Sequence, residues 1–474
     1  MAKRKTLSTD TLQALGAAHL AALLMDIAEG DAALKRRLRM EIAGPEQAAA
    51  DVRKRLASLK RAKSYIEWNK TKALVLDLET QLGAITGKVA PLAPAEALDL
   101  LWRFLALAGP LYERCDDSNG YLGDVFYMAL TALPDLAKAA KTDPETLAEQ
   151  VFVAVQENGY GQVDGLIPQM AEALGPAGLT HLKVLVKDLA KTPVPVPPDK
   201  ERKVVGWGGH GETYVDEIEA SRRKSMVKVA LKDIADAEGD VDGYIALYDA
   251  KTRQAPAIAA DIAARLLQAG RADEALAALD AATGNPRRWA EWHTTRLQVL
   301  EALGQGEAAQ AQRWQQFESI LSAGDLRDYL KRLPDFDDIE AEDKALEYAL
   351  AFEPPEMALF FLCHWPALDH AAKLVLQLGD ALEGNDYETL TSLADALSAR
   401  HQLATTLALR AMISFALERA RTKRYRHAAR HLLECESLSA QIEDYGDHSD
   451  HAAFVATLKQ AHGRKYSFWE RVGM

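Results

Sequence analysis

The sequence predicts an all-α protein, an α-solenoid built from helical hairpins. Alanine and leucine dominate the composition, and runs of β-branched residues are scarce. Most stretches between glycines or prolines are long enough for three or four helical turns, which favours helix over strand. The 474 residues exceed the roughly 250 to 300 at which one hydrophobic core stops growing. We therefore expect several domains or one stacked array.

Residues 1–191 are predicted to form a HEAT-like helical domain. Asn119-Gly120-Tyr121 recurs as Asn158-Gly159-Tyr160, 39 residues later, and a period of about 40 is typical of two-helix HEAT units. Either Thr9 or Asp10 can cap the first helix. The expected helices cover 9–30, 31–42, 45–64, 70–86, 94–113, 121–140, 143–157, 164–174 and 176–190.

Residues 192–211 are predicted to be a linker between two domains. The segment TPVPVPPDKERKVVGWGGHG contains four prolines and four glycines, a composition that cannot continue a helix. Its last six residues also fit the G-x-G-x-x-G pattern of dinucleotide-binding loops. No buried strand precedes the pattern and the following helix leads into charged residues, so we favour a linker.

Residues 212–474 are predicted to form a second helical domain with a different repeat. Gly270 recurs as Gly304, 34 residues later, and 34 is the tetratricopeptide period. Ala263 and Ala275 are small, as helices that cross closely require. On these residues the segment resembles tetratricopeptide repeats. A third copy fits at Ala416, Ala428 and Cys435, with Lys423 in the place of the turn glycine.

Three segments relate the whole chain to a known family: 116–120 (DDSNG), 239–242 (GDVD) and 425–435. Through them the chain resembles an uncharacterised bacterial family of helical-repeat proteins that contain a domain of unknown function. The resemblance implies helical repeats and no established activity. The C-terminal half is also similar to helical regions attached to SWIM-type zinc fingers, but the chain lacks the paired cysteines of such fingers.

The predicted function is a non-catalytic scaffold that binds a peptide or helix of an unknown protein partner in a concave groove. In tetratricopeptide repeats the first helix of each pair lines the groove, so the resemblance nominates side chains on those helices. They are Asp261, Gln268, Thr294, Thr295, Gln298, Arg410 and Arg421. We expect these residues to bind by hydrogen bonds and charge, with no cofactor and no catalytic residue.

A basic stretch, residues 35–72, predicts nucleic-acid binding as an alternative. The net charge of −13 opposes broad attraction to nucleic acid, yet this stretch has twelve lysines or arginines against four acidic residues. Tyr65 and Trp68 could stack on bases or pack inward; a solvated helix face with buried aromatics is the competing interpretation. The patch comprises Lys35, Arg36, Arg37, Arg39, Arg53, Lys54, Arg55, Lys60 and Arg61.

A metal-dependent enzyme is the second alternative. His427, His431 and Cys435 are spaced by four residues, so they share a helix face, and zinc accepts these ligands. A fourth ligand, such as His448 or His451, would be needed. Because Cys435 also falls on a small-residue packing position of the third repeat copy, we predict no metal site.

The expected location is the cytoplasm. Cys115, Cys363 and Cys435 are far apart in the sequence, which suits a reducing compartment. The N-terminal segment lacks an apolar signal core. No run approaches the roughly 18 apolar residues of a membrane span, so we expect no membrane contact.

Overall fold

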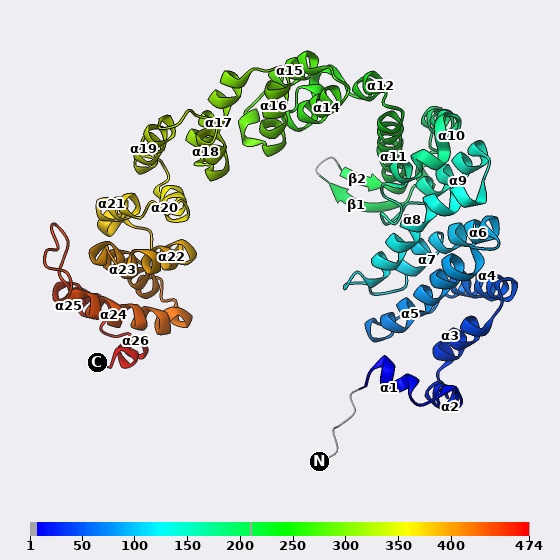
Figure 1. The fold of residues 1–474 in the computed structure, drawn as a ribbon, viewed down its shortest axis with the longest axis horizontal. Coiled ribbons are helices and arrows are strands. Elements are labelled where there is room, and N and C mark those ends of the chain that lie inside the picture. Colours follow the sequence, from blue (N-terminus) through cyan, green and yellow to red (C-terminus); the bar gives the residue numbers. More distant parts are fainter. Residues whose placement is uncertain (1–6, 209–210, 474) are drawn as a thin grey trace. The chain divides into compact units, whose positions relative to one another are not determined.

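The computed structural model describes residues 7–208 and 211–473. Helices form nearly all of its regular structure, which confirms the all-α prediction (Figure 1). Within those residues the only strands are β1 (Val204–Gly208) and β2 (Gly211–Tyr214), which pair antiparallel. The chain divides into two compact units, the first ending at Arg271 and the second beginning at Ala272.

The helices of the first unit follow one another with short connections. They are α1 (Thr9–Gln13), α2 (Ala17–Ile27), α3 (Ala32–Ile42), α4 (Pro45–Arg61), α5 (Trp68–Ala84), the π-helical turn η1 (Ile85–Val89), α6 (Pro94–Leu105), α7 (Ala108–Tyr112), α8 (Tyr121–Ala140), α9 (Pro144–Gln156), α10 (Leu166–Lys191), η2 (Asp199–Glu201), α11 (Val215–Glu238), α12 (Val241–Ala246), α13 (Ala250–Arg253) and α14 (Pro256–Gln268).

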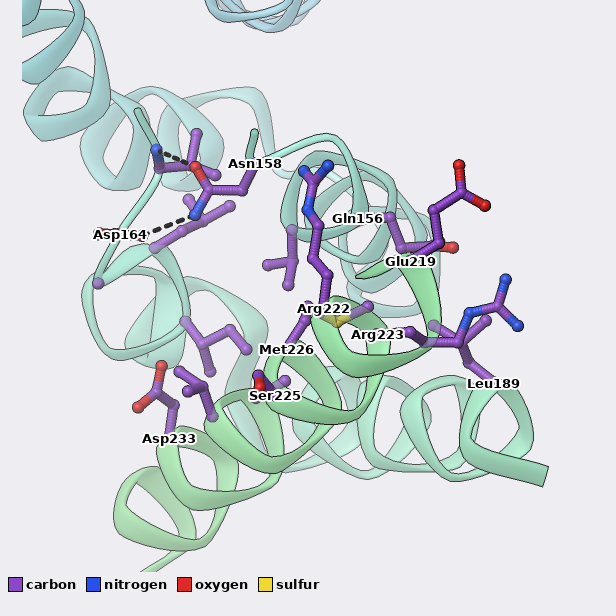
Figure 2. A pocket seen from close by; sticks show the side chains of 17 residues that line it. Gln156, Asn158, Asp164, Leu189, Glu219, Arg222, Arg223, Ser225, Met226 and Asp233 are labelled. Atoms are coloured by element: carbon purple, nitrogen blue, oxygen red, sulfur yellow. Dashed lines mark hydrogen bonds between the residues drawn. The ribbon is translucent and has the colours of Figure 1, made fainter. Parts of the chain in front are cut away.

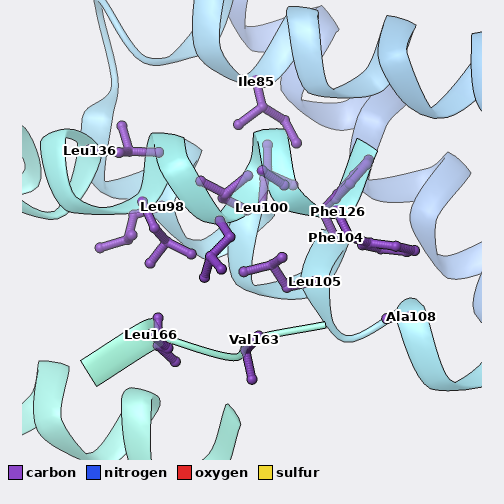
Figure 3. Close-up of a cluster of buried hydrophobic side chains, with 14 of the residues drawn as sticks. Ile85, Leu98, Leu100, Phe104, Leu105, Ala108, Phe126, Leu136, Val163 and Leu166 are labelled. Atoms are coloured by element: carbon purple, nitrogen blue, oxygen red, sulfur yellow. The ribbon is translucent and has the colours of Figure 1, made fainter. Parts of the chain in front are cut away.

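Each of these helices packs on helices that are close to it in the chain. Helix α6 packs on α8, and α10 packs on α8, α9 and α11. The buried apolar residues form one cluster from Met40 to Ile234. Figure 3 shows side chains of η1, α6, α8 and the start of α10 gathered in this cluster. The Phe104 and Phe126 rings join α6 to α8, with centroids 5.7 Å apart, so aromatic contact adds to the aliphatic burial.

Most of the predicted helices of this unit are confirmed, and the exceptions have local causes. Gly16, at φ 81°, separates α1 from α2, where one helix was predicted. The first cap is Ser8, whose Oγ accepts the Thr11 N–H at 3.3 Å, so the assignment to Thr9 or Asp10 was wrong. The two helices predicted around residue 175 are the halves of α10, which bends where Gly175 adopts φ 59° before Pro176.

The segment 192–211 contains structure that the sequence did not indicate. Val204 pairs with Tyr214 and Trp207 with Glu212; Gly209 and His210 of the glycine-rich pattern lie outside the described residues. Arg202 fixes this hairpin to the start of α11, because its guanidinium pairs with Asp216 at 2.7 Å and lies 3.8 Å from the Tyr214 ring centroid. The predicted change of repeat type at 192–211 stays a prediction. The boundary between the two compact units is a different one and falls after Arg271.

The regular structure of the second unit is all helical within the described residues. Its elements are α15 (Ala272–Asp280), η3 (Pro286–Arg288), α16 (Ala290–Ala302), α17 (Gly306–Ile320), α18 (Ala323–Leu330), α19 (Asp337–Leu350), α20 (Pro355–His364), α21 (Leu368–Leu378), η4 (Gly379–Ala381), α22 (Tyr387–Leu397), α23 (Gln402–Glu418), η5 (Thr422–Arg424), α24 (Tyr425–Ser439), α25 (His451–His462) and α26 (Tyr466–Val472). Neighbours in the chain again pack together, such as α22 on α23 and α23 on α24. One apolar cluster extends from Phe317 to Val472.

The predicted turn glycines share one backbone geometry. Gly270 has φ 74° and Gly304 has φ 69°. The next residue in each case donates its N–H to a carbonyl five residues earlier: Arg271 to Leu266 at 2.8 Å, and Gln305 to Leu300 at 2.9 Å. This left-handed ending of a helix is the Schellman arrangement, so both glycines have the predicted role.

In the third copy the turn residue is Ala420 rather than Lys423. Ala420 has φ 48°, and Arg421 donates its N–H to the Ala416 carbonyl at 2.9 Å. Lys423 lies in η5, which separates the turn from α24. The prediction failed because it assumed a connection of constant length, whereas η5 adds three residues to it.

Exchanging glycine and alanine at these equivalent turns is expected to have opposite effects. Gly304→Ala should lower the free energy of unfolding by about 1 kcal/mol, because alanine resists the left-handed conformation. Nothing lies within 4 Å of the added Cβ, so the effect comes from the backbone. Ala420→Gly should raise it by up to about 1 kcal/mol. Denaturant unfolding measures both changes, and a destabilising Ala420→Gly would contradict the assignment.

Candidate functional site

The seven predicted groove residues have different environments. Gln268, Thr294, Gln298 and Arg421 are exposed. Thr295 is 8% exposed, which contradicts its predicted contact with a partner. It lies on the buried face of α16 together with Trp292 and Val299, because residues three and four apart share a helix face.

Asp261 of α14 is bound within the first unit. Its carboxylate accepts hydrogen bonds from Tyr244 Oη at 2.6 Å and from Arg265 Nη1 at 2.9 Å. Burial opposes the charged form, but these hydrogen bonds prevail and lower the pKa of Asp261. Arg265 also pairs with Asp236 at 2.6 Å. The Asp261 carboxylate therefore stabilises the packing of α11, α12 and α14.

Arg410 is 5% exposed, which also contradicts its predicted place in an open groove. Helix α23 is apolar on nearly every side, so its lone arginine lies inside the second unit. Its Nη1 donates to the Ser449 carbonyl at 2.7 Å, and its guanidinium carbon lies 4.5 Å from the centroid of the Phe454 ring. Burial lowers the pKa of Arg410.

The predicted basic patch separates into paired and unpaired residues. Arg36 and Arg55 both bind Asp77, which is 4% exposed, and Arg53 binds Glu96 at 2.9 Å. Arg61 donates to the Ala57 carbonyl at 3.2 Å. The other side chains of the patch form no hydrogen bond or ion pair with a described residue. They are Lys35, Arg37, Arg39, Lys54 and Lys60.

The two aromatic residues beside this patch are exposed. Tyr65 is 64% and Trp68 is 71% accessible to solvent, so the interpretation that buries them is wrong. They flank the start of α5, next to the exposed residues Lys63 and Lys70. Large apolar rings beside cations are typical of surfaces that stack bases and contact phosphates.

The three candidate metal ligands have different environments. His427 is exposed, whereas His431 and Cys435 are 3% and 0% exposed. Burial lowers the pKa of His431 to about 4 and raises the pKa of the Cys435 thiol to about 12. Metals bind the thiolate, and the Cys435 Sγ instead lies 3.8 Å from the Thr406 carbonyl. No group of three potential metal-ligating side chains occurs among the residues described.

A cavity of about 480 Å³ lies between the end of α9 and helices α10 and α11 (Figure 2). Its floor is apolar and includes Val163, Leu166 and Met226. Asn158 closes one side, because its Nδ2 donates to Asp164 at 2.6 Å and its Oδ1 accepts the Val163 N–H. The cavity can hold one or two apolar side chains of a ligand.

Charged side chains of both signs line this cavity. Arg222 and Asp233 lie three helical turns apart on α11, and Glu219 and Arg223 lie close to Arg222 (Figure 2). Burial, together with the nearby Asp236 carboxylate, raises the pKa of Asp233 to about 6.

A second groove lies on the other side of α9, between α9 and α6. It has a volume of about 530 Å³ and is lined by Trp102, Gln150, Val153 and Glu157. Val153 is 51% exposed. The Trp102 indole N–H and the Gln150 Oε1 are both buried, and neither has a hydrogen-bond partner in the part of the chain that the structure describes. Both side chains line the groove, and these two polar atoms are covered and unpaired beside its apolar surface.

Residues 2–471 match a family of unknown function, DUF6880. The chain belongs to the DUF6880 family. This membership confirms the resemblance to a family without an assigned activity, and it covers both compact units. No curated protein matches this DUF6880 chain. None of the helices formed by residues 7–208 and 211–473 has both the length and the apolar character that a membrane span requires.

Sequence patterns did not indicate the residues that line these two cavities of the DUF6880 protein. Trp102 belongs to the apolar run of α6, so periodicity did not separate it from the core. Val153 follows the buried Val151 by two residues, which places it on another side of α9, and one exposed valine gave no sign of a groove. Arg410 did give a signal, because it interrupts the apolar run Leu407 to Ile413. A lone charge in such a run indicates a buried charge rather than a surface contact.

Replacing His431 should reduce the acid sensitivity of the second unit. The pKa is 6.5 in the unfolded chain and about 4 in the folded one, so between these pH values only the unfolded state binds the proton. The free energy of unfolding should therefore fall by up to roughly 3 kcal/mol from pH 6.5 to 4. His431→Leu should remove this loss. His427→Leu, an exposed change on the same helix, is the control and should retain it in pH-dependent denaturation.

Proposed function

We propose that this DUF6880 protein is a non-catalytic cytoplasmic scaffold, a helical solenoid with HEAT-like and tetratricopeptide-like parts, that binds an extended peptide segment of a protein partner. The observation that carries the proposal is the groove between α6 and α9. Its buried indole N–H and amide oxygen lack partners among the described residues. A peptide group offers both complements, a carbonyl for Trp102 and an N–H for Gln150.

Physical chemistry favours such an occupant. A buried polar group without a partner costs about 1 to 3 kcal/mol, so hydrogen bonds from a peptide backbone would recover part of that energy. Val153 and Ala154 supply apolar surface beside these groups, where a side chain of the segment can be buried. Main-chain hydrogen bonds with neighbouring apolar pockets are a common mode of peptide recognition.

Two further observations support the proposal. Helices of each unit pack mainly on neighbours in the chain, the kind of packing that repeat proteins use when they bind partners along their length. Cys115, Cys363 and Cys435 are unpaired, which suits the cytoplasm.

A charged side chain in place of Val153 should weaken binding of the protein partner. Val153→Asp places a carboxylate on the groove and should reduce capture of a specific partner from the native host by about tenfold or more. Val184→Asp is the matched control, because Val184 is 50% exposed on α10 and lines none of the cavities described above. Quantitative mass spectrometry after affinity capture measures both variants. If the Val153→Asp variant recovers every partner as well as the parent protein does, the groove is not the binding site.

Nucleic-acid binding is the second candidate function, and the exposure of Tyr65 and Trp68 favours it. Lys60, Lys63 and Lys70 are close to them in the sequence and are exposed as well. Single-stranded nucleic acid would stack on the rings while its phosphates contact the lysines.

A salt series tests this second function. Binding of a single-stranded RNA in gel shifts should weaken with salt, with a log–log slope of about −0.7 for each phosphate contacted. Trp68→Ala should weaken binding severalfold. Trp207→Ala should not, although Trp207 is 79% exposed. RNA binding that does not depend on salt concentration would exclude this nucleic-acid site. Equal losses of affinity in the Trp68→Ala and Trp207→Ala variants would exclude it too.

A further inference from the structure

The side chain of Arg410 is buried with most of its hydrogen-bonding capacity unused. Only Nη1 has a partner, the Ser449 carbonyl at 2.7 Å. Nε and Nη2 are buried, and no described residue accepts a hydrogen bond from either. No carboxylate of the described residues lies within ion-pair distance of this guanidinium. The Asp380 and Asp450 carboxylates favour its charge from farther away, but burial outweighs them and lowers the pKa of Arg410.

The unused atoms define the kind of group that would fit. Nε and Nη2 lie on one edge of the planar guanidinium, and this edge binds two oxygens of one carboxylate or phosphate in parallel. A buried charge is retained at a cost unless a counter-charge is present. An oxyanion on this edge would supply both the hydrogen bonds and the charge.

A cavity adjoins Arg410. It has a volume of about 240 Å³ and lies between α23 and the segment that joins α21 to α22, with Phe454 of α25 at its edge. Ser414, one turn after Arg410 on α23, also lines it. The volume is below the usual range for drug-sized ligands, so the cavity suits a molecule of a few heavy atoms.

The rim of this cavity carries the opposite charge. Asp380, Glu383 and Glu418 line it and are exposed, and none forms an ion pair with a described residue. Arg419 is the one rim cation among the described lining residues. A simple anion would meet three carboxylates against two arginines, whereas a molecule with a carboxylate and a nearby ammonium would match both the interior and the rim.

The geometry points to a binding site for a free amino acid in this cavity. Its carboxylate would accept hydrogen bonds from Nε and Nη2 of Arg410, and its ammonium would face Asp380 and Glu383. The site lies within the second unit and does not depend on the peptide groove proposed for the first unit.

Ligand screening on the full-length protein tests the inference. Each of the twenty amino acids is added at 10 mM, on the order of the dissociation constants expected for ligands of this size, and the melting temperature is recorded. Acetate, inorganic phosphate and methylamine are the controls. At least one amino acid should raise the melting temperature in a concentration-dependent manner, and no control should match it. An equal shift with acetate or phosphate would show a simple anion site, and no shift with any amino acid would refute binding; either result overturns the inference.

Two variants separate binding from structure. Arg410→Met removes a buried charge that has no ion-pair partner, so the unliganded variant should melt no lower than the parent while its affinity for the amino acid falls at least about tenfold. The double variant Asp380→Asn with Glu383→Gln changes exposed residues only and should weaken amino-acid binding severalfold by calorimetry. Glu388→Gln, an exposed change on α22 outside the cavity, is the control. If Arg410→Met does not fold, the double variant decides, and an unchanged affinity in it would refute the assigned orientation.

Discussion

The structure depends on apolar burial between helices that are close together in the chain. In the first unit one buried cluster extends from Met40 to Ile234, and in the second another extends from Phe317 to Val472. Fully buried alanines such as Ala97, Ala148 and Ala408 let the backbones of neighbouring helices approach closely. Each helix is stabilised by its neighbours. Side chains that are not needed for this packing can therefore line grooves and contact ligands. The grooves on both sides of α9 are formed in this way.

Local sequence signals predicted the helices well and the connections less well. Residues 121–140 form α8 as expected, and the bend of α10 falls at Gly175 where two helices were predicted, because periodicity and glycine or proline punctuation act within a few residues. The hairpin at 204–214 and the left-handed Ala420 were not predicted. The hairpin depends on contacts such as the Arg202–Asp216 pair, and the Ala420 turn depends on the length of the connection. Local helix propensity predicts neither.

Prediction of the candidate sites was limited in the same manner. Cys435 is fully buried, as a packing position requires, while the repeat alignment that suggested this position stays a prediction. The same resemblance predicted that Thr295 and Arg410 lie on an open face. A repeat resemblance assigns residues to helix faces, but it does not predict which other segments of the chain cover those faces. The Ser449 carbonyl, from the connection before α25, meets Arg410. Gly384 illustrates the same limit, since a Cβ there would overlap the Ala411 carbonyl, a contact that only the fold reveals.

Hydrogen exchange under mildly denaturing conditions tests neighbour-dependent packing most directly. The full-length protein is incubated at increasing denaturant concentration, and the exchange of backbone amides is followed by mass spectrometry along the chain. The account predicts that groups of adjacent helices lose protection in separate steps, because each group depends only on its neighbours. A single transition in which all helices of both units lose protection at the same denaturant concentration would contradict it.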